Sequence, residues 1–194
     1  MGPQTAYAFR VYAYRHTGGP SPFLPDRDST PPNPEPATAP PLWPRQAQVD
    51  AVFGGMGVHQ VRLHLPFPMQ LSWDRTKPVT SFFVHEKVHD SARRCFERIA
   101  DAYDAAARRE TGIAIFGGCL NVRRMRGGSA WSMHSWGIAI DFDPERNGLN
   151  SNRANARLAR ADCLTFWKIW EDEGWVSLGR TRDFDWMHVQ AARL

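Results

Sequence analysis

The stretch at residues 132–141 constrains the fold of this chain more than any other part of its sequence. A loop that carries a histidine runs into a segment whose side chains alternate from Gly137 onward, which predicts a strand. One face of that strand would carry the large apolar side chains, namely Ile138, Ile140 and Phe142. The other face would be almost bare apart from the carboxylate of Asp141, which leaves room for a bulky group such as a metal ion with its ligands.

Two histidines and one aspartate are the candidates for such a metal site. His134 lies seven residues before Asp141, and His188 lies near the C-terminus in the segment Asp-Phe-Asp-Trp-Met-His-Val-Gln. Two histidines and one carboxylate, with a fourth position open for water, form a common catalytic zinc site. Each residue taken alone has an ordinary explanation, as a loop cap, a strand end or a core histidine, so the combination carries the hypothesis.

The combination resembles the zinc D-alanyl-D-alanine carboxypeptidase and L-alanyl-D-glutamate endopeptidase family (peptidase family M15), which includes VanY, VanX and phage peptidase endolysins. The pattern Ser-x-His-x-x-Gly-x-Ala-x-Asp at residues 132–141, followed by Asp-x-x-His at residues 185–188, carries the resemblance. The arginine-bearing segment at residues 117–128 is similar to the corresponding segment of that family. The likeness spans residues 112–190 and extends more faintly back to about Trp43.

The resemblance implies a peptidoglycan stem peptide as substrate, with exopeptidase and endopeptidase cleavage both open, and one Zn²⁺ per chain held by His134, Asp141 and His188. It also implies that Asp185, three residues before the last histidine, is the catalytic base, with Asp183 as the fallback. The alternative for Asp185 is an aspartate that caps a turn. Strict alternation would place Asp185 on the opposite face from His188, so the strand must bend or begin after it.

The same resemblance bears on four further residues. Arg123 best matches the family's catalytic arginine, whose charge would stabilise the tetrahedral intermediate, and Arg126 is the runner-up and a candidate for substrate binding. Ser132 would hydrogen-bond the substrate or simply hold the loop. Gln190 departs from the pattern, because relatives often carry glutamate there, and this puts the orientation of the neighbouring metal ligand in question.

A rival motif, His85-Glu86-Lys87-Val88-His89, matches the His-Glu-x-x-His signature of another class of zinc peptidases. That class needs a third ligand downstream, and its usual His-x-x-Gly-x-x-His extension is absent. His85 falls within the apolar stripe of the predicted helix and His89 at its edge, so packing explains both. Two non-enzymatic hypotheses also stay open: a Hedgehog-like domain that contains zinc without acting as an enzyme, and a wall-binding module without metal.

The N-terminal part of the chain differs in composition from the rest. Ten of the fifteen prolines among the 194 residues lie between Pro20 and Pro44, which excludes a central strand or a helix there. We interpret residues 1–45 as an N-terminal segment with a proline-rich linker or arm, preceded by a short strand at residues 7–14. Residues 46–194 form the predicted zinc peptidase domain.

Within this domain we predict an α+β fold, in which a small, largely antiparallel sheet packs against two main helices. The main helices are expected at residues 84–109 and from 151 or 152 to 173. A short helix is expected at residues 46–53, and strands at residues 60–65, 111–116, 175–178 and 186–191. The last two strands would form a hairpin around residues 179–183.

The formal charge of +4 favours an anionic partner, and the cell wall fits better than nucleic acid because no basic run or helix-turn-helix spacing occurs. The three cysteines predict reduced, buried thiols rather than a disulfide framework. Residues 1–16 lack the features of a signal peptide, and no apolar run approaches the roughly 18 residues of a membrane span. We therefore expect a monomer that is made in the cytoplasm and acts on the cell wall after lysis-linked release.

Overall fold

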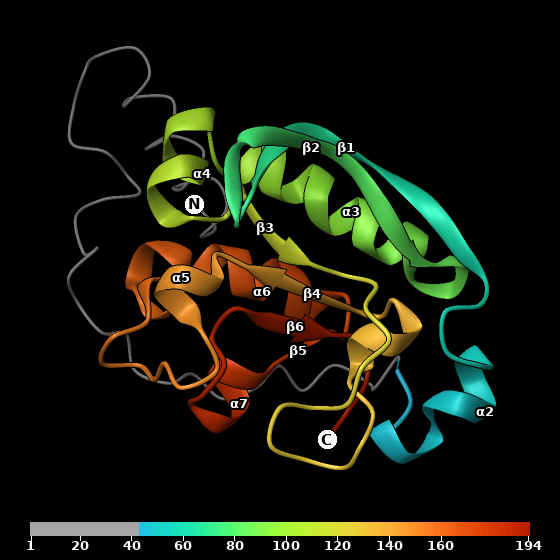
Figure 1. Ribbon diagram of the computed structural model, residues 1–194. Coiled ribbons are helices and arrows are strands. Elements are labelled where there is room, and N and C mark those ends of the chain that lie inside the picture. The colour runs from blue at the N-terminus through green and yellow to red at the C-terminus, as the bar shows by residue number, and fades with distance from the viewer. Residues whose placement is uncertain (1–42) are drawn as a thin grey trace, which may run out of the picture.

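The computed structural model describes residues 43–194, so the predicted strand at residues 7–14 and nearly all of the proline-rich segment lie outside the described residues. The fold is mixed α/β and contains one six-stranded sheet in the order β2-β1-β3-β4-β6-β5 (Figure 1). All neighbouring strands are antiparallel except the parallel pair β1 and β3. The predicted fold class and the largely antiparallel sheet are therefore confirmed.

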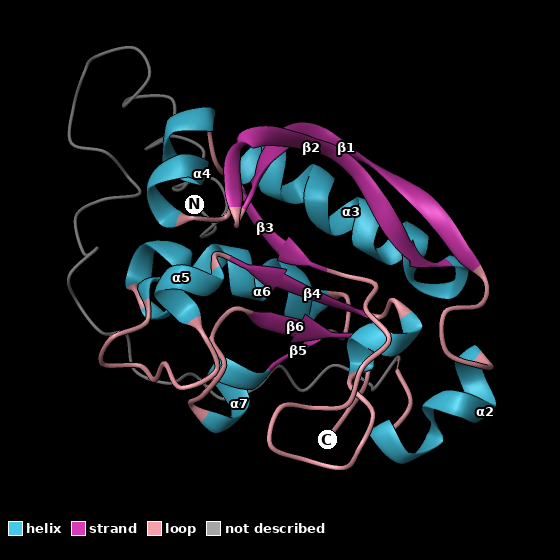
Figure 2. Ribbon diagram, viewed as in Figure 1, coloured by secondary structure: helices cyan, strands magenta, loops and turns pink. Residues whose placement is uncertain are grey.

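The strands β1 (Gln60–Leu71) and β2 (Asp74–His85) form a long hairpin that arches over helix α3 (Figure 2). The prediction ended the first strand at residue 65, because Pro66 and Pro68 follow. The structure continues the strand through both prolines, and the register with β2 shifts between His64 and Met69. Proline has no N–H to donate to a ladder, and the irregular stretch is where that missing donor can be tolerated.

The helix predicted at residues 84–109 is two helices, α3 (Glu86–Ala102) and α4 (Ala105–Thr111). His85 still belongs to β2, and its side chain caps α3 by accepting a hydrogen bond from the backbone N–H of Lys87 (3.1 Å). Asp104 caps α4 in the same way, by accepting from Ala107 N (2.8 Å), and ends the continuous periodicity. Because α4 reaches Thr111, strand β3 (Ile115–Gly118) begins later than predicted.

The helix predicted from residue 151 or 152 to residue 173 is correct only in its second half, α6 (Leu164–Asp172). Residues 151–163 form turns and the two short 3-10 helices η3 (Arg157–Ala159) and η4 (Ala161–Cys163). Asparagine side chains explain the difference, because Asn155 Oδ1 accepts from Asn152 N and Asn152 Oδ1 accepts from Ala154 N (both 2.9 Å). Such local bonds compete with a helix.

The remaining elements are short. The N-terminal turns η1 (Gln46–Gln48) and α2 (Val49–Phe53) occupy the predicted short helix. The central part contains η2 (Met133–Trp136), β4 (Ala139–Phe142) and α5 (Pro144–Asn147). The last strands are β5 (Val176–Ser177) and β6 (His188–Gln190), which pair as predicted but are joined through helix α7 (Leu178–Arg182) rather than by a tight turn.

The core lies between the sheet and the helices α3 and α6 and is rich in aromatic rings. Phe142, at the end of β4, packs against Phe96 of α3 and against Phe166 and Trp170 of α6, with ring centroids 5.0 to 6.2 Å apart. All three cysteines are buried and free. No helix of residues 43–194 is long and apolar enough to cross a membrane. The aromatic cluster fixes β4, and with it the strand that carries Asp141.

Glu173 ties the end of α6 to α3. Its two carboxylate oxygens accept from Arg94 Nε (2.9 Å) and Arg94 NH2 (2.7 Å), and one of them also accepts from Ser91 Oγ (3.0 Å). Ser91 Oγ in turn accepts from Trp175 Nε1 (2.9 Å). The hydrogen bonds from Arg94 lower the pKa of Glu173 despite its partial burial.

The substitution Glu173→Gln is expected to lower the free energy of unfolding at pH 7, because the amide loses the charge-assisted bonds to Arg94. Since the folded pKa of Glu173 is depressed, its contribution is complete above the unfolded value of about 4.3 and is lost as pH falls through the folded value. Urea denaturation should therefore show the difference between the two chains shrinking from pH 7 to roughly pH 3.

The matched control is Asp172→Asn, which removes one charge from an exposed ion pair with Arg98. It should change the free energy of unfolding by less than about 1 kcal/mol at pH 7. A difference between the natural chain and Glu173→Gln that stays constant down to pH 3 would contradict the assignment.

Candidate metal site

The turn η2 positions His134 and is held from both sides. Ser132 begins the turn, and its Oγ accepts a hydrogen bond from His134 N (3.4 Å). The backbone N–H of Ser132 donates to Arg123 O (3.0 Å), which ties the turn to the preceding loop. The turn ends at Gly137, whose N–H donates to His134 O (3.0 Å). These contacts agree with the second of the two roles predicted for Ser132, that of holding the loop.

Gly137 is required both by its backbone and by its surroundings. Its φ of +67° lies in the left-handed region. A Cβ at this position would lie 2.2 Å from Gln60 Oε1 and 3.0 Å from Gln60 Nε2. That Nε2 donates to Trp136 O and Val58 O (both 2.9 Å), so the Gln60 side chain clamps the turn from β1. The glycine of the sequence motif leaves space for this clamp.

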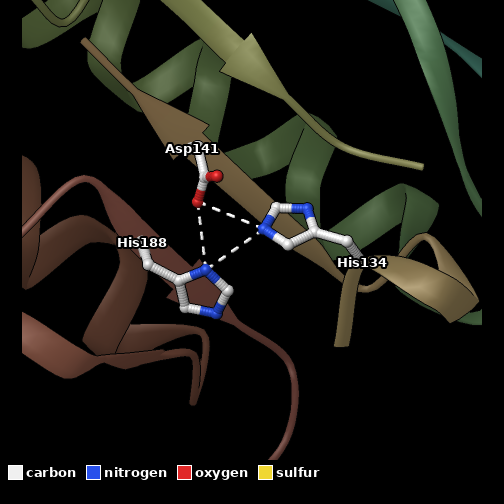
Figure 3. A group of neighbouring side chains, drawn as sticks. All are labelled: His134, Asp141 and His188. Atoms are coloured by element: carbon white, nitrogen blue, oxygen red, sulfur yellow. Dashed lines mark hydrogen bonds and ion pairs between the residues drawn. The ribbon is translucent and has the colours of Figure 1, made fainter. Parts of the chain in front are cut away.

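The structure brings His134, Asp141 and His188 together in a buried cluster (Figure 3). His134 Nε2 lies 3.2 Å from Asp141 Oδ1, and His188 Nδ1 lies 3.0 Å from the same oxygen. The two ring nitrogens are 3.2 Å apart. Asp141 and His188 are direct partners in the antiparallel register of β4 and β6, while His134 arrives from η2. The turn η2 and the strands β4 and β6 thus supply one atom each.

The second nitrogen of each imidazole has its own partner outside the cluster. His134 Nδ1 lies 2.7 Å from Cys119 O, and because a carbonyl only accepts, this nitrogen must carry the proton. His188 Nε2 lies 3.0 Å from Gln190 Oε1. The nitrogens that face Asp141 are therefore lone-pair acceptors in the neutral rings. Three acceptor atoms face one another with no donor between them.

Such an arrangement could hold a cation at its centre, and the spacing of the three atoms is compatible with zinc. Ligand atoms of a tetrahedral ion with bonds of about 2.0–2.1 Å lie roughly 3.3 Å apart, close to the observed spacing. Without a metal, the same electrostatics favour a proton. Burial alone would raise the pKa of Asp141, but the two histidines lower it; burial alone would lower the pKa of His188, but the hydrogen bond and charge of Asp141 raise it.

Asp185 lies on the loop before β6, which begins only at His188, as the alternation required. Its φ is +53°, and its backbone is fixed by bonds from Asp185 N to Leu149 O (3.2 Å) and from His188 N to Asp185 O (3.1 Å). Asp185 is 7% exposed, and its Oδ1 has no hydrogen-bond partner among the described residues. Burial raises the pKa of this carboxyl, against the opposing charges of His188, His134 and Arg126.

Asp183, the fallback base, is occupied elsewhere. Its Oδ1 accepts from Arg153 N (2.7 Å) and from Trp186 Nε1 (3.1 Å), and its backbone, at a φ of +56°, ends α7. These contacts give Asp183 the turn-capping role that was the alternative for Asp185. Of the two carboxylates, Asp185 is the one with a buried oxygen that has no hydrogen-bond partner among the described residues.

The candidate arginines lie on a small loop whose two arms pair at Arg124 and Trp131, with the Arg124 guanidinium 3.9 Å above the indole ring. Arg123 is fixed through its backbone, because its N–H donates to Ser135 Oγ (3.1 Å), and its guanidinium donates to Arg124 O (3.2 Å). Arg126 lies near the exposed tip, and no hydrogen bond or ion pair holds its guanidinium within residues 43–194. Its charge acts on Asp185 and offsets a small part of the rise that burial causes in the pKa of that carboxyl.

The rival His-Glu-x-x-His motif does not form a metal site. His85 ends a strand, and both of its ring nitrogens are used, since Nε2 lies 2.8 Å from Phe53 O and Nδ1 caps α3. The His89 ring bonds to its neighbour Asp90 (3.0 Å). In the part of the chain that the structure describes, the one group of three converging metal-binding side chains is that of His134, Asp141 and His188.

Residues 126–191 match a family model described as D-alanyl-D-alanine carboxypeptidase. The matched stretch contains the three clustered side chains and Asp185. The resemblance to this peptidase family is thereby confirmed over that stretch. No curated protein and no solved structure gives a significant match to the chain.

The substitution Gly137→Ala is expected to lower the free energy of unfolding by about 3 kcal/mol, from left-handed backbone strain and the loss of two hydrogen bonds of Gln60. Gly127→Ala is the matched control, because Gly127 has a φ of +75° but open space around it. It should cost only about 1–2 kcal/mol. Equal losses for the two variants in urea denaturation would show that Gln60 does not clamp the turn.

Proposed function

We propose that this chain, which matches the D-alanyl-D-alanine carboxypeptidase family over residues 126–191, is a zinc-dependent peptidase that cleaves peptidoglycan stem peptides. The observation that carries the proposal is the buried triangle of acceptor atoms, 3.0 to 3.2 Å apart, from His134, Asp141 and His188. The unpaired carboxylate oxygen of Asp185, within electrostatic reach of that triangle, supports a catalytic role rather than a purely structural ion.

The three clustered side chains would hold the ion as two neutral imidazoles and one carboxylate. When bound, zinc supplies Lewis-acid polarisation of the scissile carbonyl and lowers the pKa of water to about 7. His134 and His188 present lone pairs inward because Cys119 O and Gln190 Oε1 accept hydrogen bonds from their outer N–H groups. Asp141 adds one negative charge, so the occupied site keeps a net positive charge toward the substrate.

Asp185 would act as the general base. Its buried, unpaired Oδ1 is free to accept a proton from the attacking water and to pass it to the amine nitrogen of the leaving peptide. Burial raises its pKa, which makes the carboxylate a stronger base for the attacking water. Asp183 is the weaker candidate, since two donors to its Oδ1 hold it in a turn-capping position.

A cation near the reacting carbonyl would stabilise the negative charge of the tetrahedral intermediate. We assign this role to Arg123, whose backbone is fixed on both sides by Ser135, and substrate binding to Arg126 at the loop tip. The guanidinium of Arg123 is held only by the neighbouring carbonyl of Arg124, so little is lost when it turns toward substrate. Ser132 serves mainly to hold the loop that carries His134.

A cell-wall substrate fits a phage or prophage endolysin and a bacterial wall-remodelling enzyme equally well. A Hedgehog-like domain that contains zinc without cleaving peptides is the competing class. Such a domain would have no use for a buried carboxylate with an unpaired oxygen, and an unsatisfied buried polar group costs about 1–3 kcal/mol. Asp185 therefore favours the enzyme.

Mass spectrometry of purified peptidoglycan fragments incubated with the protein tests the function directly. Loss of one terminal alanine would identify a carboxypeptidase, and cleavage between L-alanine and D-glutamate an endopeptidase. Either product should disappear when a zinc chelator is added and return when Zn²⁺ is restored, because the cluster holds the ion that the reaction needs. Fragments left intact by the zinc-loaded protein would overturn the proposed function.

The substitution Asp185→Asn should lower turnover of a cleaved fragment by about 10²–10⁴-fold, because the amide cannot accept the proton. Zinc affinity should remain that of the natural chain, since Asp185 is not a member of the ligand cluster. Asp183→Asn is the matched control and should keep natural turnover, because an amide oxygen can still accept from Arg153 and Trp186. Unchanged turnover in the Asp185 variant would remove the assigned base.

A further inference from the structure

Gln190 links a metal-site histidine to the last residues of the chain. The residue is 1% exposed. Its Oε1 lies 3.0 Å from His188 Nε2, and its Nε2 donates to Ala192 O (2.8 Å). A weaker contact of 3.4 Å joins Gln46 Nε2, on η1, to the same Oε1. The amide therefore stands between a ring nitrogen on one side and a backbone carbonyl on the other.

The carbonyl of Ala192 determines how this amide is oriented. Because a carbonyl only accepts, the NH₂ group of Gln190 must face Ala192, and its oxygen must face His188. An amide oxygen also only accepts, so His188 Nε2 must carry the proton. The lone pair of the ring then lies on Nδ1, the nitrogen that faces Asp141 and His134.

We propose that Gln190 is a positioning residue, which fixes the tautomer and the ring orientation of His188 and thereby sets the zinc affinity of the site. The inference rests on the metal site and does not require that the chain be a peptidase. If Nδ1 carried the proton instead, that proton would occupy the place of the ion. The acceptor on Gln190 excludes this tautomer, because it would leave two acceptors in contact in a buried space.

The other imidazole, that of His134, is oriented by the backbone and not by a side chain. His134 donates to the backbone carbonyl of Cys119, which is present whatever side chain stands at position 119. Among the described residues, Gln190 is thus the side chain whose chemistry determines the orientation of a ligand imidazole. Substitution there changes the metal site without touching its ligands.

The oxygen and the NH₂ group of the amide bind different partners. Substitutions that change one and keep the other can therefore distinguish a positioning role from a merely structural one. The oxygen faces the metal ligand, whereas the NH₂ group holds Ala192 and the C-terminal segment. Glutamate at position 190 would keep the acceptor but place a second acceptor against Ala192 O. Methionine, of similar length, would remove both hydrogen bonds.

Zinc affinity, measured by competition with a chromogenic chelator, tests the proposal on Gln190→Met, Gln190→Glu and the natural chain. The methionine variant should bind zinc about 10–100-fold more weakly. The glutamate variant should keep or tighten the natural affinity, while its metal-free form unfolds at a lower temperature because Ala192 O has lost its donor. Gln46→Met, which removes the weak outer contact, is the control and should leave the affinity unchanged.

The ring nitrogen resonances of His188 give a second readout that fold stability does not move. In ¹⁵N-labelled, zinc-loaded natural protein and in Gln190→Glu they should show a protonated Nε2 and a metal-bound Nδ1, and in Gln190→Met this pattern should be lost or mixed. A folded Gln190→Met with natural zinc affinity would overturn the proposal. If that variant does not fold, a tenfold loss of affinity in Gln190→Glu would overturn it instead.

The outcomes separate this inference from the proposed function. A natural chain that binds zinc with the expected Gln190 dependence, yet leaves every peptidoglycan fragment intact, would support the positioning role and contradict the peptidase. A natural chain that binds no zinc would overturn the metal site and the inference together.

Discussion

The structure is built around three hydrogen-bond acceptors that repel one another in its interior. Two imidazole lone pairs and a carboxylate oxygen face one another within 3.2 Å in a buried space. Acceptors normally avoid such contacts, and the rings would rotate away if their outer nitrogens were free. The bonds to Cys119 O and Gln190 Oε1 prevent this rotation. The fold therefore holds three acceptor atoms in an arrangement that could bind a cation.

Strand β4 makes this possible because its two faces serve different purposes. Phe142 anchors the strand in the aromatic core formed with α3 and α6, while Asp141, one residue earlier, points to the opposite side. The pairing of Asp141 with His188 follows from the register with β6, in which Ile140 opposes Val189. A slip of one residue would bury the wrong face, so the hydrophobic core specifies the geometry of the site.

The sequence predicted the parts of the molecule that depend on local periodicity or on motif spacing. The alternation after Gly137 predicted β4, and the two motifs predicted which side chains would converge. The errors came from side chains that bond to nearby backbone, since Asp104 divides the long helix and Asn152 and Asn155 prevent the second helix from starting early. Propensity does not reveal which of these bonds will form, because each competes with helix by roughly 1 kcal/mol.

The sequence could not reveal which groups bind the outer ring nitrogens of His134 and His188. The partner of His134 is the backbone carbonyl of residue 119, and any residue type at that position would supply it. The partner of His188 is visible as Gln190, but its meaning depends on Ala192 O, whose position only the fold defines. The two histidines consequently differ in whether a substitution at the partner residue removes the group that orients the ring. Substitution at position 190 removes or changes the side-chain acceptor that orients His188, whereas substitution at position 119 leaves the carbonyl that orients His134 in place.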